Sequence, residues 1–102
     1  MVDDMILASL LLVGLDYKLD ALSEPARQGL AMMLAERGEL SFRELVQLAK
    51  PMNASTLNYH LKTLMKAGLV KNYYRKVEGK DDYSFYQLTE LGRDFLKQIG
   101  AL

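Results

Sequence analysis

Cysteine is absent from this sequence of 102 residues, and histidine occurs only once, as His60. The chain can therefore form no disulfide and has no thiolate nucleophile, and a metal centre built from cysteine and several histidines is excluded. The sequence also contains no Gly-rich phosphate loop, no paired-carboxylate constellation and no nucleophile–base set. We therefore expect a protein that is not an enzyme, with no catalytic residues, no cofactor and no metal site.

Long apolar runs are also missing. A transmembrane helix needs roughly 20 apolar residues, and the longest run here, from Met5 to Val13, is much shorter. Two aspartates, Asp3 and Asp4, precede it, whereas a secretory signal begins with positive charge. We therefore expect a cytoplasmic protein without a membrane partner. The length, with half the residues hydrophobic and a quarter charged, predicts a single globular domain over residues 1–102.

The net charge is zero, which argues against a generic polyanion binder. The charges are nevertheless separated along the chain. Residues 1–40 contain seven acidic and three basic side chains, whereas residues 50–82 contain seven basic and three acidic ones. We interpret the basic half as a phosphate-facing surface, although clustered lysines can also serve only to keep a face soluble.

Hydrophobic periodicity and helix-end signals predict three helices before residue 50. The first, over residues 3–18, is apolar on nearly all sides in its middle, so one side is expected to face another chain. The second begins near residue 23 and stops near Gly38. The third opens with a capping box, Ser41 to Glu44, and extends through residue 49. The second and third helices are predicted to bury Leu30, Met33, Leu34, Leu45 and Leu48.

The fourth predicted helix, over residues 53–67, has the most informative pattern. Its apolar face consists of Leu57, Leu61, Leu64 and Met65, and the opposite face carries Ser55, Tyr59, Lys62 and Lys66. Asn53 is a suitable N-cap, and Gly68 can take the left-handed conformation that ends a helix. A helix with short polar groups near its start suits a DNA major groove, whereas an ordinary surface helix would have a merely solvated polar face.

Beyond Gly68 the pattern changes from helix to strand. Residues 69–88 contain two segments rich in aromatic and β-branched side chains, separated by a polar loop of hairpin length. Thr89 then caps a last helix over residues 89–100, which has Leu91, Phe95 and Ile99 on one face. The predicted fold is mainly α with a small β-hairpin (α+β). A helix-turn-helix followed by such a hairpin is a winged helix-turn-helix.

Several segments resemble those of ArsR-type regulators in order and spacing. They are ALSEPAR at 21–27, ELSFREL at 39–45, STLNYHLKTL at 55–64 and AGLV at 67–70. The segment YQLTELGR at 86–93 resembles the exit from the wing in ArsR- and MarR-like winged helix proteins. The resemblance covers about residues 20–98.

The resemblance implies a transcriptional regulator that binds duplex DNA as a homodimer, with its first and last helices supplying the dimer contacts. We take the site to be palindromic and the regulator to be repressor-like. The predicted interface residues are Ile6, Leu10, Val13, Phe95 and Ile99. Metal-sensing members have cysteines in the third helix, or acidic and histidine ligands in the last one. The third helix here has no cysteine and the last has no histidine, which argues against metal sensing.

Residues of the fourth helix can be given roles on DNA. Asn53, Ser55 and Thr56 lie where free amides and the positive helix end favour phosphate. Asn58 and Tyr59 are the candidate base readers, and Lys62 is placed to reach phosphate or a guanine edge. Each role has an alternative: Asn53 can be only a cap, Tyr59 a packed ring, and Lys62 a solvated charge. His60, beside the leucines, is expected to be a packing residue.

The wing adds three candidate DNA-binding cations, Arg75, Lys76 and Lys80, which could reach the adjacent minor groove. Asp81 and Asp82 at the same tip weaken that prediction. A different class of function stays open, namely a winged helix that acts as a protein–protein interaction module in a larger complex, without specific DNA binding. The zero net charge and the apolar first helix favour it. Steep salt dependence of duplex binding would distinguish the DNA binder.

Overall fold

The computed structural model of the chain describes residues 17–80 and 83–102. Most of the predicted first helix therefore lies outside the described residues, together with the predicted interface residues Ile6, Leu10 and Val13. Residues 17–21 are helical, so this helix ends three residues later than the predicted boundary at residue 18. Within the described ranges, no helix is sufficiently long and apolar to cross a membrane.

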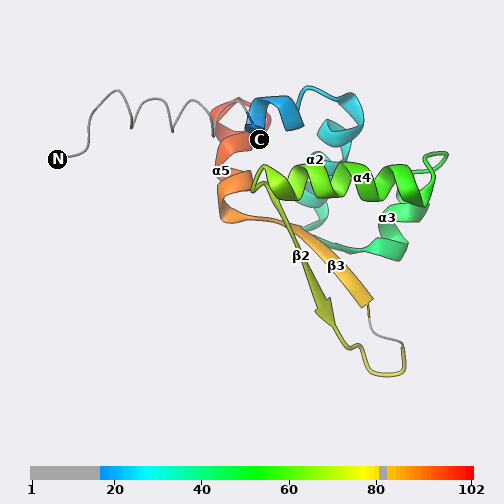
Figure 1. Cartoon of the computed structure of the whole chain (residues 1–102). Coiled ribbons are helices and arrows are strands. Elements are labelled where there is room, and N and C mark those ends of the chain that lie inside the picture. Colours follow the sequence, from blue (N-terminus) through cyan, green and yellow to red (C-terminus); the bar gives the residue numbers. More distant parts are fainter. Residues whose placement is uncertain (1–16, 81–82) are drawn as a thin grey trace.

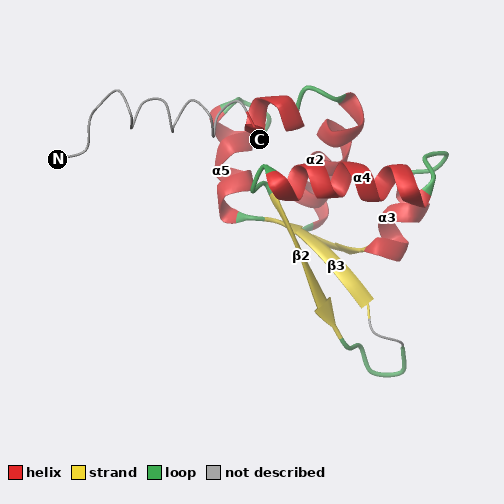
Figure 2. Ribbon diagram, in the orientation of Figure 1, coloured by secondary structure: helices red, strands yellow, loops and turns green. Residues whose placement is uncertain are grey.

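The order of elements after this segment agrees with the predicted winged helix (Figure 1). The helices are α2 (Pro25–Arg37), α3 (Phe42–Leu48), α4 (Ala54–Lys66) and α5 (Glu90–Gln98), and the strands are β1 (Glu39–Ser41), β2 (Val70–Arg75) and β3 (Tyr83–Leu88). With the helical residues 17–21, they form an α+β fold in which α3, a short turn and α4 make the helix-turn-helix. The hairpin of β2 and β3 extends away from the helices as the wing (Figure 2).

The sheet has three strands, whereas the sequence predicted only the hairpin. All neighbours are antiparallel, and β3 lies between β1 and β2. Strand β1 pairs Leu40 with Tyr86 and Ser41 with Phe85. It escaped prediction because three residues are too few to show the alternation typical of a strand. Its presence connects the start of α3 directly to the wing.

The predicted helix ends are confirmed by hydrogen bonds. Asn53 Oδ1 accepts from the backbone N–H of Thr56 at 2.8 Å, which caps α4. At α3, the Ser41 hydroxyl accepts from the Glu44 N–H at 3.1 Å, and Glu44 Oε1 accepts from the Ser41 N–H at 3.0 Å. Gly68 has φ +78°, the left-handed conformation expected after α4. These local signals position α4 between the turn and the wing.

The core lies between α2, α4, α5 and the inner face of the sheet, and Leu57, Leu61 and Leu64 of α4 are fully buried in it. The prediction of burial is wrong for two residues. Leu48 and Met65 are exposed, because each lies in the last turn of its helix, on the side turned away from the neighbouring elements. Met33 is only partly buried. The sequence reading also missed Leu96, which is buried beside Phe95.

Helix α5 packs closely on the chain that leaves α4. The Thr89 hydroxyl accepts from the Gly92 N–H at 2.8 Å and donates to the carbonyl of Gly68 at 2.6 Å. A Cβ atom at Gly92 would lie 2.1 Å from the carbonyl oxygen of Leu69, so only glycine fits there. This contact holds α5 beside the base of the wing.

Candidate nucleic-acid interface

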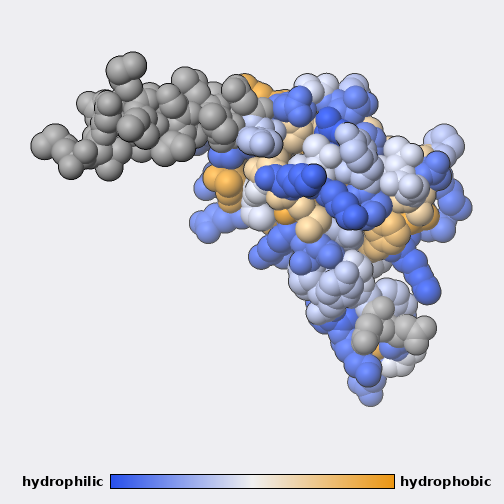
Figure 3. Space-filling view, viewed as in Figure 1, coloured by the Kyte–Doolittle hydropathy of each residue, from blue (hydrophilic) through white to orange (hydrophobic). Residues whose placement is uncertain are grey.

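Helix α4 presents its polar side to solvent while its leucines are buried. Ser55, Thr56 and Lys62 are exposed, and 63% of the Tyr59 side chain is exposed. The surface over α4 is largely hydrophilic in Figure 3, which has the orientation of Figure 1. The Tyr59 ring is therefore largely exposed to solvent, and it also makes an edge contact with the His60 ring, at 5.5 Å between centroids. Asn58, the other candidate base reader, is half-buried.

The role of Asn53 as a cap is shown, since its side-chain oxygen is occupied by the Thr56 N–H. That bond also satisfies one of the free amides at the start of α4. The remaining polar groups of Asn53 and Thr56 are still available for contact with phosphate, and this contact stays a prediction.

His60 does more than pack. Its Nδ1 lies 3.0 Å from Nη1 of Arg27, a buried residue of α2. A guanidinium has only donors, so Nδ1 must be the acceptor and the ring proton sits on Nε2. Arg27 Nε also donates to the carbonyl of Ala21 at 2.6 Å. One buried arginine thus connects the end of the helical segment 17–21 with α4, and sequence reasoning gave it no role.

The two faces of the wing differ in chemistry. Val70, Asn72 and Tyr74 of β2 lie on the face that continues into the core, which is the side of α4, because alternate residues of a strand share a face. Arg75 lies on the other face, where its guanidinium pairs with Glu39 at 2.8 Å and lies 4.4 Å from the centroid of the Phe85 ring.

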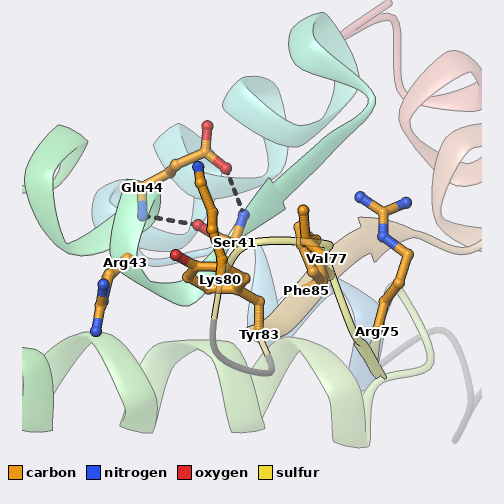
Figure 4. Close-up of a pocket in the computed structure, with 8 residues that line it drawn as sticks. All are labelled: Ser41, Arg43, Glu44, Arg75, Val77, Lys80, Tyr83 and Phe85. Carbon is orange, nitrogen blue, oxygen red and sulfur yellow. Dashed lines mark hydrogen bonds between the residues drawn. The ribbon is translucent and has the colours of Figure 1, made fainter.

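A hollow of about 420 Å³ separates this second face from the start of α3 (Figure 4). The predicted wing cations Arg75 and Lys80 line it, and Lys80 Nζ lies 5.8 Å from the centroid of the Tyr83 ring. Lys76 is exposed further along the hairpin. The wing cations are thus not gathered on the side of α4, and their contact with a minor groove stays a prediction.

Two ionisable groups near this hollow have shifted pKa values. The hydrogen bond from the Ser41 N–H lowers the pKa of Glu44, with help from the Ser41 hydroxyl and the charges of Lys80 and Arg37. Burial raises the pKa of Tyr73, and the hydrogen bond that its hydroxyl donates to the Glu39 carboxylate raises it further. Both shifts belong to bonds that hold the sheet and α3 together, and neither indicates acid–base chemistry.

The two predicted interface residues of the last helix, Phe95 in α5 and Ile99 directly after it, lie in different surroundings. Phe95 is only 4% exposed and belongs to the core of its own chain, whereas 48% of Ile99 is exposed. Ile99 also lines a small apolar hollow of about 200 Å³ with Met32 and Leu96. Only Ile99 therefore presents substantial surface to a partner, and its role at an interface stays a prediction.

Comparison with known proteins agrees with this geometry. Residues 24–72 match the family model of the bacterial regulatory proteins of the arsR family. No curated protein sequence is significantly similar to the chain.

Solved structures share the fold over most of the chain. HlyU from Vibrio cholerae is 26% identical, with coverage of 85% of this chain and 88% of that one and a TM-score of 0.67. A transcriptional regulator homologue from Pyrococcus horikoshii is 24% identical, covers 83% and 84%, and has a TM-score of 0.66. A MarR-family regulator from Enterococcus faecalis is 18% identical, covers 99% and 83%, and has a TM-score of 0.70.

The arsR family consists of DNA-binding regulators and not of enzymes, as the sequence predicted. The matched segment runs from the residue before α2 into β2 and therefore contains the whole helix-turn-helix. Residues 24–72 form a helix-turn-helix domain of the arsR type, and the chain as a whole resembles winged helix transcriptional regulators of the ArsR/MarR type.

Proposed function

We propose that the protein acts as a cytoplasmic homodimer that recognises a palindromic DNA site through α4 and represses transcription by occupying that site. One observation carries this proposal. Three fully buried leucines fix α4 against the core, while Tyr59 and Lys62 on its opposite side are exposed. A rigidly held helix with an accessible polar face is suited to lie in a major groove.

Within α4, we assign sequence reading to Tyr59 and Asn58. Tyr59 has the exposure that contact with a thymine methyl or a sugar requires, and Asn58 can pair with adenine through its amide. Ser55, Thr56 and Lys62 would hold the phosphate backbone and so set the register of the helix on the duplex. Asn53 would support them as the cap of α4.

The homodimer is supported by exposed apolar side chains beside α5. Tyr17, Leu19, Met32, Ile99 and Leu102 are all more than a third exposed. The apolar run of the predicted first helix, from Met5 to Val13, precedes these residues in the sequence. Burial of these side chains between two copies would remove them from water. A two-fold axis would then place two α4 helices about 34 Å apart, which matches half-sites one DNA turn apart.

The proposal can be tested by selecting bound duplexes from a random pool, followed by titrations at several salt concentrations and measurement of the mass of the complex. Lys62→Ala should weaken binding to all duplexes and reduce the slope of log affinity against log salt by about 0.9. Lys97→Ala, an exposed lysine at the end of α5, is the matched control and should leave the slope unchanged.

Tyr59→Ala should instead change which duplexes are selected, with a cost of about 1–3 kcal/mol on the preferred one. The proposal would be wrong if the wild-type protein selected no duplex or formed complexes with a single copy of the chain.

A further inference from the structure

A notch that is mainly apolar, with a few polar groups, lies between the first half of α4 and the wing. It has a volume of about 410 Å³ and is lined by Phe42, Ala54, Ser55, Asn58, Ser84 and Tyr86. The rings of Phe42 and Tyr86 lie 6.3 Å apart, and Tyr86 is buried, so these rings form a firm apolar side. Ser55 and Asn58 contribute polar groups from α4, and Ser84 contributes a hydroxyl from β3. The notch therefore lies between α4, the proposed DNA-binding helix, and β3 of the wing.

The hydroxyl oxygen of Ser84 is held by a hydrogen bond from Asn72. Asn72 Nδ2 lies 2.7 Å from Ser84 Oγ and 2.9 Å from the carbonyl oxygen of Phe85. A carbonyl can only accept, so the amide nitrogen of Asn72 must point at both oxygens. The Ser84 oxygen thus accepts from Asn72, and its own proton remains to be donated to another group. Ser84 can therefore act as a hydrogen-bond donor in the notch while Asn72 holds its oxygen.

An aromatic ring stands next to this donor. Tyr74 is the residue opposite Ser84 in the β2–β3 ladder, so the two side chains lie on the same face of the wing. The Tyr74 side chain is 77% exposed. An oriented hydroxyl beside an exposed ring suits the alternating phosphate and deoxyribose of a nucleic-acid backbone, since the hydroxyl can bind phosphate and the ring can lie against the sugar.

We propose that the notch seats one sugar-phosphate strand of the bound duplex, with the Ser84 hydroxyl donating to a phosphate oxygen and the Tyr74 ring lying against the neighbouring sugar. This inference depends on the proposed DNA binding through α4 and adds a second backbone contact, on the α4 side of the wing. The contact is uncharged, so it positions the duplex without releasing counterions. It differs in this respect from the contacts of Lys62 and the wing cations.

Ser84→Ala tests the donor. A hydrogen bond to a charged group is among the stronger hydrogen bonds in proteins, so the variant should bind the selected duplex about tenfold more weakly. Its salt slope should equal that of the wild type, because no charge is lost. Ser84→Thr keeps the hydroxyl and should retain wild-type affinity. Ser23→Ala removes a hydroxyl from the turn before α2, outside the notch, and is the matched control.

Asn72→Asp tests the orientation of the hydroxyl. A carboxylate at this position cannot donate, so the Ser84 proton would turn towards it and away from phosphate. The new negative charge would also repel the backbone. Asn72→Asp should therefore lose more affinity than Ser84→Ala, whereas Asn72→Asp combined with Ser84→Ala should lose little beyond Asn72→Asp alone.

A third arm locates the contacted phosphate on the duplex itself. Single methylphosphonate linkages, which carry no charge, are placed at each position of the selected duplex and titrated with the wild-type protein and with Ser84→Ala. One linkage should weaken the wild type several-fold and have a clearly smaller effect on Ser84→Ala.

If the wild type binds duplex but no linkage distinguishes the two proteins, or if Ser84→Ala binds like the wild type, the notch is not a backbone site. If the wild type binds no duplex at all, the proposed function itself fails.

Discussion

Replacement of His60 by phenylalanine should destabilise the protein through the arginine it leaves behind. Arg27 is 9% exposed, and its guanidinium donates to Ala21 and to His60. The one ion pair found among residues 17–80 and 83–102 joins Arg75 to Glu39, so no described carboxylate compensates the buried charge of Arg27. His60→Phe fills a similar volume but removes the acceptor. An unsatisfied charged donor costs about 1.5–3 kcal/mol, and we expect a loss near the middle of that range.

Thermal unfolding at a fixed protein concentration measures this loss, since the stability of a dimer depends on concentration. For a domain of this size, a loss of about 2 kcal/mol lowers Tm by roughly 8–16 °C. His60→Gln keeps an acceptor and is expected to fall between the wild type and His60→Phe. The double variant Arg27→Met/His60→Phe should be less destabilised than the sum of the two single changes, because neither polar partner is then left without the other.

The reasoning is refuted if His60→Phe melts with the wild type, or if the two single losses simply add. Either result would mean that the hydrogen bond between α2 and α4 contributes nothing to stability.

Four further predictions concern the frame around α4. Gly92→Ala should lower the free energy of unfolding by about 1–3 kcal/mol, because its Cβ would collide with the backbone of Leu69. Gly29→Ala, in α2 with open space around it, should raise that free energy by about 0.5–1 kcal/mol; urea unfolding measures both. Glu44→Gln should be less stable than the wild type at pH 7. Because folding lowers the pKa of Glu44, its charged form stabilises the protein above the ordinary pKa of a glutamate and stops doing so as pH falls through the lowered value. The gap between the two proteins in urea titrations should therefore close as the pH falls below the ordinary pKa of a glutamate and through the lowered value; a gap independent of pH would contradict the assignment. Arg75→Met should change stability by less than about 1 kcal/mol in the same assay, because its ion pair is exposed to solvent.

Much of the fold could be predicted because its signals are local. The capping box at Ser41, the cap at Asn53 and the left-handed Gly68 each depend on residues within a few positions of one another. The leucine face of α4 follows from helical spacing alone. These signals sufficed to place the helix-turn-helix and the hairpin correctly.

Other features depend on contacts between distant parts of the chain. Strand β1 exists only because β3 pairs with it, and Arg27 meets His60 across 33 positions of sequence. The side of the wing on which a residue lies follows from strand register, which the sequence does not mark. For this reason Arg75 was chosen for its charge, whereas Asn72, Tyr74 and Ser84 on the α4 side were overlooked.

The three-residue strand β1 has a mechanical consequence for the way this protein meets its target. Strand β3 is hydrogen-bonded to β1 on one side and to β2 on the other, so the wing is tied by hydrogen bonds to the peptide that leads into α3. If α4 and the wing bind DNA as proposed, they would do so at a fixed separation. The duplex would then have to adjust its shape to the protein, so base steps that bend or narrow easily would be favoured even where no side chain touches them.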